Sequence, residues 1–97
     1  MVTHIVFFAF APEDKAAHMR EAQRQIEAMV GRVPSLRSLE VGLNFAQEDR
    51  AMDMALVTRF DDRAGLEAYA THPVHQEVIA YIRTVTEYTK VVDYEHP

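Results

Sequence analysis

The segment Val2–Phe10 constrains the fold of this chain more than any other, because it is apolar on both sides of a strand. Successive side chains of a strand point to opposite faces, so this segment presents two sets of side chains. One set is His4, Val6, Phe8 and Phe10, and the other is Ile5, Phe7 and Ala9. A strand with one face in water usually alternates apolar and polar residues. We therefore expect a central strand that is covered on both faces.

The rest of the chain shows helix and strand patterns in a simple order. In chain order, the expected elements are a strand over Val2–Phe10, a helix over Glu13–Val30, strands over Arg37–Phe45 and Asp53–Phe60, a helix from Asp61 or Asp62 to about Val85, and a strand over Tyr88–Glu95. The second helix is expected to break near His72-Pro73, because proline lacks the backbone N–H that a helix needs. The order β-α-β-β-α-β predicts an α+β fold of ferredoxin-like topology, in a single domain over residues 1–97.

Two helices can cover only one face of such a sheet, which leaves the second apolar face of the first strand without a cover. The chain has 97 residues and no cysteine, so disulfides cannot support its small core. An exposed apolar sheet face usually marks an interaction surface. We therefore expect a homodimer in which two four-stranded sheets pack face to face and close a barrel. A monomer with a partly exposed sheet is the alternative.

Charge and composition bear on the partners of the chain. The net charge is -5, from 10 basic and 15 acidic residues, and this balance argues against a nucleic-acid partner. The apolar run near the N-terminus is far too short to span a bilayer and follows no basic segment, so we expect neither a membrane segment nor a signal peptide. These observations predict a cytoplasmic protein. With only three glycines and no glycine-rich loop, nucleotide binding has no support.

The segment from Tyr69 to His75 is the main candidate for chemistry, because aromatic and imidazole side chains flank the proline there. Histidine titrates near neutral pH and can act as a general base or acid. The phenol of Tyr69 can donate a hydrogen bond to a developing oxyanion. Asp93 follows Val91 in phase on the last expected strand, where its carboxylate could orient an imidazole.

Two other interpretations of this segment stay open. The histidines could be structural, one capping a helix terminus and the other filling a gap in the core. His72 and His75 could also bind a metal ion together with a carboxylate, but only two of the three ligands that such a site needs are close in sequence, so no metal is predicted. His4, within an apolar strand, is typical of a core histidine.

Four segments resemble the stress-responsive α/β-barrel (Dabb) domain family. They are Thr3-His4-Ile5-Val6, Leu66-Glu67-Ala68-Tyr69, Thr71-His72-Pro73-Val74-His75 and Val91-Val92-Asp93-Tyr94. The resemblance covers nearly the whole chain, and the segment from Tyr69 to His75 is its most specific part. It implies a homodimer whose sheets form a dimeric α/β barrel, with a cavity for a small hydrophobic or aromatic ligand in each subunit, between sheet and helices.

The family's characterised enzymes are plant polyketide cyclases, which close an aromatic ring by aldol chemistry. The resemblance implies that His75 is the general base, that Tyr69 stabilises the enolate and that Asp93 holds His75. It also implies a substrate-binding set that comprises His4, Val6, Phe8, Leu56, Thr58 and His72. No cofactor is expected, because proton transfer and oxyanion stabilisation suffice for this chemistry.

Four functions therefore remain under consideration. The first is a small-molecule-binding homodimer, stress-related or without an assigned reaction, whose pocket lies beside Tyr69 and His75. The second is a cyclase-like enzyme that uses these two residues. The third is a cofactor-independent monooxygenase of the kind found on related dimeric barrels. The fourth is a stress protein that acts through protein contacts alone.

Overall fold

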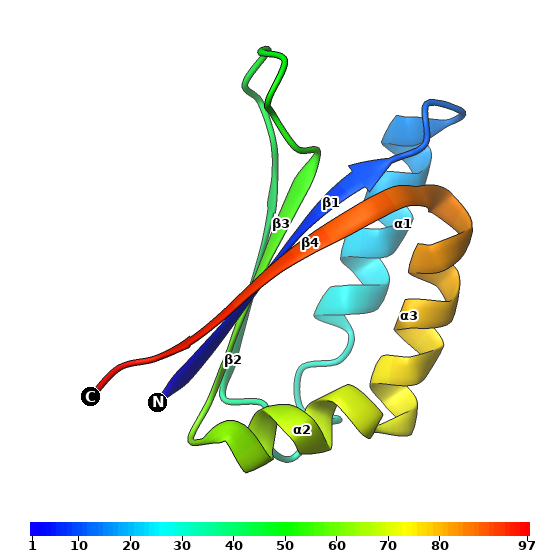
Figure 1. The fold of residues 1–97 in the computed structure, drawn as a ribbon. Helices are drawn as coiled ribbons and strands as arrows, with labels where there is room; N and C mark the ends of the chain where they lie inside the picture. Colours follow the sequence, from blue (N-terminus) through cyan, green and yellow to red (C-terminus); the bar gives the residue numbers. More distant parts are fainter.

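Four strands and three helices make up the computed structural model, which describes residues 1–97 (Figure 1). In chain order, the elements are β1 (Val2–Phe10), α1 (Lys15–Glu27), β2 (Ser38–Leu43), β3 (Met54–Phe60), α2 (Arg63–Thr71), α3 (Pro73–Val85) and β4 (Thr86–Glu95). The strands form one antiparallel sheet in the order β2-β3-β1-β4, so β1 is central as predicted. The predicted α+β, ferredoxin-like fold is confirmed.

The helices α1 and α3 cover one face of the sheet, and α2 lies across one end of it (Figure 1). The even-numbered side chains of β1 face these helices and join a single apolar core. The largest core side chains are buried almost completely and comprise Phe8, Phe10, Ile26, Met29, Met54, Phe60 and Tyr69. Burial of these side chains is the main force that holds the helices on the sheet.

The turn at Pro73 separates the two helices that follow β3. The carboxylate of Asp62 accepts a hydrogen bond from the backbone N–H of Gly65 at 2.8 Å and so caps α2. Pro73 is the first residue of α3, where its missing N–H costs nothing. The predicted break is confirmed, and it produces two helices that meet at a sharp bend (Figure 1).

The ends of several elements differ from the sequence prediction. The helix expected over Glu13–Val30 is shorter, because Asp14 adopts a left-handed conformation before it and the chain turns after Glu27 towards Gly31, where φ is +81°. The strand expected to reach Phe45 ends at Leu43. The last strand starts at Thr86, directly after α3, and not at Tyr88.

The second face of the sheet carries no helix and is called the open face below. It presents the odd-numbered side chains of β1 and their neighbours on the other strands. Among its apolar side chains, Phe7 is 36% exposed, Tyr88 51%, Val92 52% and Tyr94 43%. No helix of the structure has the length and the apolar composition that crossing a membrane requires.

Candidate active site between helix α3 and the sheet

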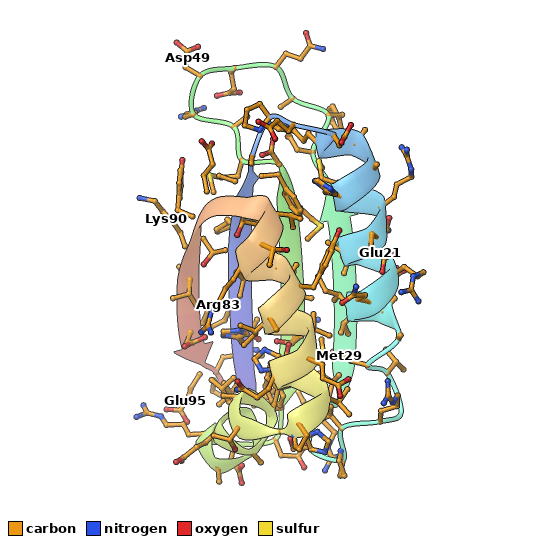
Figure 2. The ribbon with its side chains drawn as sticks, turned by 90° about the vertical axis from the view of Figure 1, so that its right-hand side faces the viewer. Glu21, Met29, Asp49, Arg83, Lys90 and Glu95 are labelled. Atoms are coloured by element: carbon orange, nitrogen blue, oxygen red, sulfur yellow. The ribbon has the colours of Figure 1, made fainter.

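A cavity of about 590 Å³ lies between α3 and the sheet, on the side of β4. Figure 2 views the molecule with α3 in front and β4 beside it. The lining side chains that could do chemistry are His4, Tyr69, His75 and Asp93. They come from β1, α2, α3 and β4, so residues far apart in the sequence meet at one place.

Most of the predicted site residues line this cavity. They are His4, Val6, Phe8, Leu56, Tyr69, His75 and Asp93. Thr58 and His72 do not line it. The Thr58 side chain is fully buried, with its hydroxyl donating to the backbone oxygen of His4 at 3.3 Å. The Nδ1 atom of His72 accepts from the Val74 N–H at 3.1 Å and caps α3, so its role is structural.

The expected pairing of Asp93 with His75 is wrong, because Asp93 binds His4 instead. Residues His4 and Asp93 are direct partners in the β1–β4 ladder, which places their side chains on the same face of the sheet. The Nδ1–H of His4 donates a short hydrogen bond to the Asp93 carboxylate. This bond fixes the tautomer of the ring and leaves Nε2 of His4 as the free nitrogen.

His75 is oriented by the backbone and not by a carboxylate. Its Nδ1 lies 3.1 Å from the carbonyl oxygen of Ala70, so Nδ1–H donates there and Nε2 keeps its lone pair. Burial lowers the pKa of His75 below its ordinary value of 6.5, and the neighbouring imidazoles of His4 and His72 lower it further, against the opposing effect of the Ala70 carbonyl. A neutral His75 can accept a proton at neutral pH.

Tyr69 is the most deeply buried of the four side chains that could do chemistry, with 1% of its surface exposed. Its ring centroid lies 4.1 Å from that of His75 and 6.2 Å from that of His4. Burial raises the pKa of the phenol far above its ordinary value, so the hydroxyl stays protonated. This hydroxyl has no hydrogen-bond partner in the protein, which leaves a donor unused beside the two imidazoles.

The residues of α3 beyond His75 that line the cavity were not predicted from the sequence. Ile79, Ile82 and Arg83 line the cavity as well. Their spacing from His75 is that of one helical face, so the helical period could have identified them. The structure contains no group of three or more His, Asp or Glu side chains placed to hold a metal ion.

These observations define the class: a ferredoxin-like α+β protein with a cavity between its sheet and its helices that is lined in part by histidine, tyrosine and aspartate. The model of the family described as "Stress responsive A/B Barrel Domain" (Dabb) matches residues 2–96. The chain belongs to this family, which confirms the resemblance seen in the sequence. It is also 30% identical to an uncharacterized protein of Streptomyces coelicolor, over 98% of this chain and 99% of that protein.

Solved structures of the same fold include one dimeric protein and two enzymes. A dimeric protein of unknown function from Bacteroides fragilis is 31% identical, with a TM-score of 0.88 over 98% of this chain and 95% of that chain. The hydroxynitrile lyase of Passiflora edulis is 20% identical, with a TM-score of 0.84 over 96% of this chain and 90% of that one. An antibiotic biosynthesis monooxygenase is 14% identical, with a TM-score of 0.76 over 100% of this chain and 99% of that one. At these identities the two enzymes show the fold alone.

Proposed function

We propose that this chain forms a homodimer that binds a small carbonyl compound and catalyses proton transfer without a cofactor, in the cavity beside Tyr69 and His75. The observation that carries the proposal is the buried Tyr69 hydroxyl, which has no partner in the protein and lies beside a neutral imidazole. An unpaired buried donor costs about 1–3 kcal/mol, a cost that a ligand oxygen would remove. A substrate carbonyl supplies such an oxygen.

The reaction step follows from the free atoms of the site. Nε2 of His75 takes the proton from a carbon next to the carbonyl, and the C–H electron pair moves into an enolate. The Tyr69 O–H donates a hydrogen bond to the enolate oxygen. The enolate carbon then takes a proton back from His75 or attacks a second carbonyl of the same molecule. In the second case a C–C bond forms, and the new alkoxide takes the proton from His75.

His4 and Asp93 form a second acid–base pair in the same cavity. The carboxylate holds Nδ1–H of His4, so Nε2 of His4 can exchange a proton with a group on the far side of the substrate. This pair supports an enzymatic function over simple binding, because Nε2 of His4 can accept a proton from a substrate hydroxyl while Nε2 of His75 acts on the C–H.

The homodimer is part of the proposal. It is supported by the dimeric Bacteroides structure and by the apolar side chains of the open face. A two-fold interface between copies of this face would bury Phe7, Val92 and Tyr94, while the cavity on the helix side stays accessible. The cytoplasmic location expected from the sequence belongs to the proposal too.

The test is an isotope-exchange measurement with phenylacetone as the probe ketone in D₂O. The wild-type protein is expected to accelerate the loss of the probe's C–H signal in the NMR spectrum, relative to buffer. His75→Gln is expected to lose this acceleration, and His96→Gln, which changes an exposed histidine near the C-terminus, is expected to keep it. Equal rates for wild-type protein and His75→Gln would contradict the proposal. Oxygen uptake with a phenolic probe would favour the monooxygenase instead.

A further inference from the structure

The cavity extends along α3 from the acid–base residues to a cationic end. His75, Ile79, Ile82 and Arg83 all line it and lie on one side of the helix. Arg83 lies eight positions after His75, which corresponds to about 12 Å along the helix axis at 1.5 Å per residue. The wall between the two ends is apolar and includes Val6 and Val91 opposite the helix. The cavity therefore has a reactive end, an apolar middle and a charged end.

Arg83 is the only arginine or lysine that lines the cavity. Several other basic residues are paired with carboxylates, as Arg37 is with Asp61 and Arg63 with Glu95. Arg83 forms no ion pair and no side-chain hydrogen bond, although Glu87 lines the same end. Figure 2 shows its side chain beside α3, towards β4. Its guanidinium group is free to bind an anion in two-pronged geometry.

We infer that Arg83 binds the anionic end of the substrate, a carboxylate, at the open end of the cavity. The substrate class is then an amphipathic molecule with a carboxylate at one end, an apolar body, and the reacting carbonyl at the end that meets Tyr69 and His75. The inference rests on the proposed function only for the carbonyl end of the substrate. The carboxylate end is inferred from Arg83 and does not depend on the proposed reaction. It makes Arg83 a specificity-determining residue.

Glu87 allows a second prediction about anion binding, in the opposite direction to that for Arg83. Its carboxylate lines the same end of the cavity as Arg83 and repels an incoming carboxylate. Neutralising Glu87 should strengthen the binding of an anion, whereas neutralising Arg83 should weaken it. A general effect of net charge would give the same two directions, so a control of equal charge change outside the cavity is needed.

The test measures binding of octanoate and of its neutral analogue octanamide by titration calorimetry. Arg83→Gln is expected to weaken octanoate binding about fivefold, the upper range for an exposed ion pair, and to leave octanamide binding unchanged. Glu87→Gln is expected to strengthen octanoate binding a few fold. Arg20→Gln is the matched control, because Arg20 is exposed on α1, forms no ion pair and does not line the cavity. This control should bind octanoate as the wild-type protein does.

The outcomes separate this inference from the proposed function. Equal octanoate affinity in Arg83→Gln and Arg20→Gln, or no octanoate binding at all, overturns the inference. Proton exchange on phenylacetone, measured with the same samples, is expected to persist in Arg83→Gln because that probe has no carboxylate. If Arg83→Gln binds octanoate as tightly as Arg20→Gln does while the wild-type protein still catalyses exchange, the anion site alone is overturned. Absence of exchange in the wild-type protein overturns the proposed function alone.

Discussion

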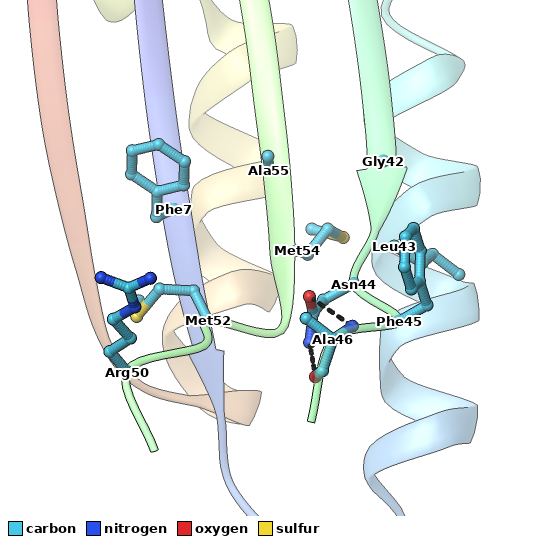
Figure 3. A pocket seen from close by; sticks show the side chains of 10 residues that line it. All are labelled: Phe7, Gly42, Leu43, Asn44, Phe45, Ala46, Arg50, Met52, Met54 and Ala55. Carbon is cyan, nitrogen blue, oxygen red and sulfur yellow. Dashed lines mark hydrogen bonds between the residues drawn. The ribbon is translucent and has the colours of Figure 1, made fainter. Parts of the chain in front are cut away.

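Two hollows of nearly equal volume lie on opposite faces of the sheet, and they differ in the chemistry of their walls. The cavity under α3 measures about 590 Å³, and its lining includes two imidazoles, the Tyr69 phenol and two carboxylates. The hollow on the open face measures about 550 Å³ and lies where β1 meets the connection between β2 and β3 (Figure 3). No histidine, tyrosine or acidic residue lines it. Volume alone therefore does not locate the reactive site.

The polar groups of the open-face hollow are already occupied within the protein. The amide of Asn44 donates to the carbonyl of Ala46 at 2.8 Å and accepts from its N–H at 3.0 Å, as the dashed lines in Figure 3 show. Arg50 is paired with Glu48. The Tyr69 hydroxyl in the other cavity has no such partner. This difference is the reason that we propose a ligand site in the cavity under α3 and an interface between two copies at the open face.

The largest expected effect is a loss of catalytic rate when a residue of the cavity under α3 is changed, with no loss when a residue of the open-face hollow is changed. His75→Gln should lower the rate of proton exchange on phenylacetone by about 10²–10⁴-fold, the usual contribution of a general base. Arg50→Gln changes a polar residue of the open-face hollow and should leave the rate unchanged. A similar loss of rate in both variants would remove the distinction between the hollows.

A change on the open face should act on assembly and spare the cavity. Phe7→Asp is expected to weaken the dimer about a hundredfold, since each copy loses roughly 1.5 kcal/mol of apolar burial and a two-fold interface counts the loss twice. Sedimentation velocity at several concentrations measures the shift towards the monomer. Proton exchange per chain should persist, and an unchanged dimer would show that Phe7 lies outside the interface.

The pH dependence of exchange should report the environment of His75. Burial lowers the pKa of this imidazole, so its neutral form persists below the ordinary value of 6.5. The acid limb of the rate profile should therefore have its midpoint below pH 6.5. The unfolded chain binds this proton more readily than the folded chain does, so protonation of His75 favours unfolding. The contribution of His75 to the free energy of unfolding is therefore complete above pH 6.5 and declines as the pH falls from 6.5 to the pKa of His75 in the folded protein. A midpoint above 6.5 would contradict the burial of the base.

The smallest expected effect concerns the unpaired phenol. Tyr69→Phe should raise the free energy of unfolding by about 1 kcal/mol, because it removes a buried hydroxyl that has no partner. The same change should slow proton exchange, since the enolate loses its donor. Tyr88→Phe is the matched control on the open face, where the exposed hydroxyl should contribute little. Urea unfolding of both variants checks the comparison, and a destabilised Tyr69→Phe would mean that the hydroxyl is satisfied.

The sequence was sufficient to predict the order of the elements, because the apolar pattern of Val2–Phe10 and the helix break at Pro73 depend only on residues that are close in sequence. It also grouped His4, Val6 and Phe8, which line the cavity, because alternate residues of β1 share one face. It could not give the partner of Asp93, since the β1–β4 register is a long-range property. It likewise could not show that Ala70 orients His75, because that contact depends on the angle between α2 and α3.

The most direct test of the account is the position of a bound probe in solution. Phenylacetone can be titrated into protein with labelled aromatic side chains and followed by NMR. The ring signals of His4, Tyr69 and His75 are expected to move, while those of Phe7 and Phe45 in the open-face hollow are expected to stay in place. Shifts confined to Phe7 and Phe45, with Tyr69 and His75 unmoved, would contradict it.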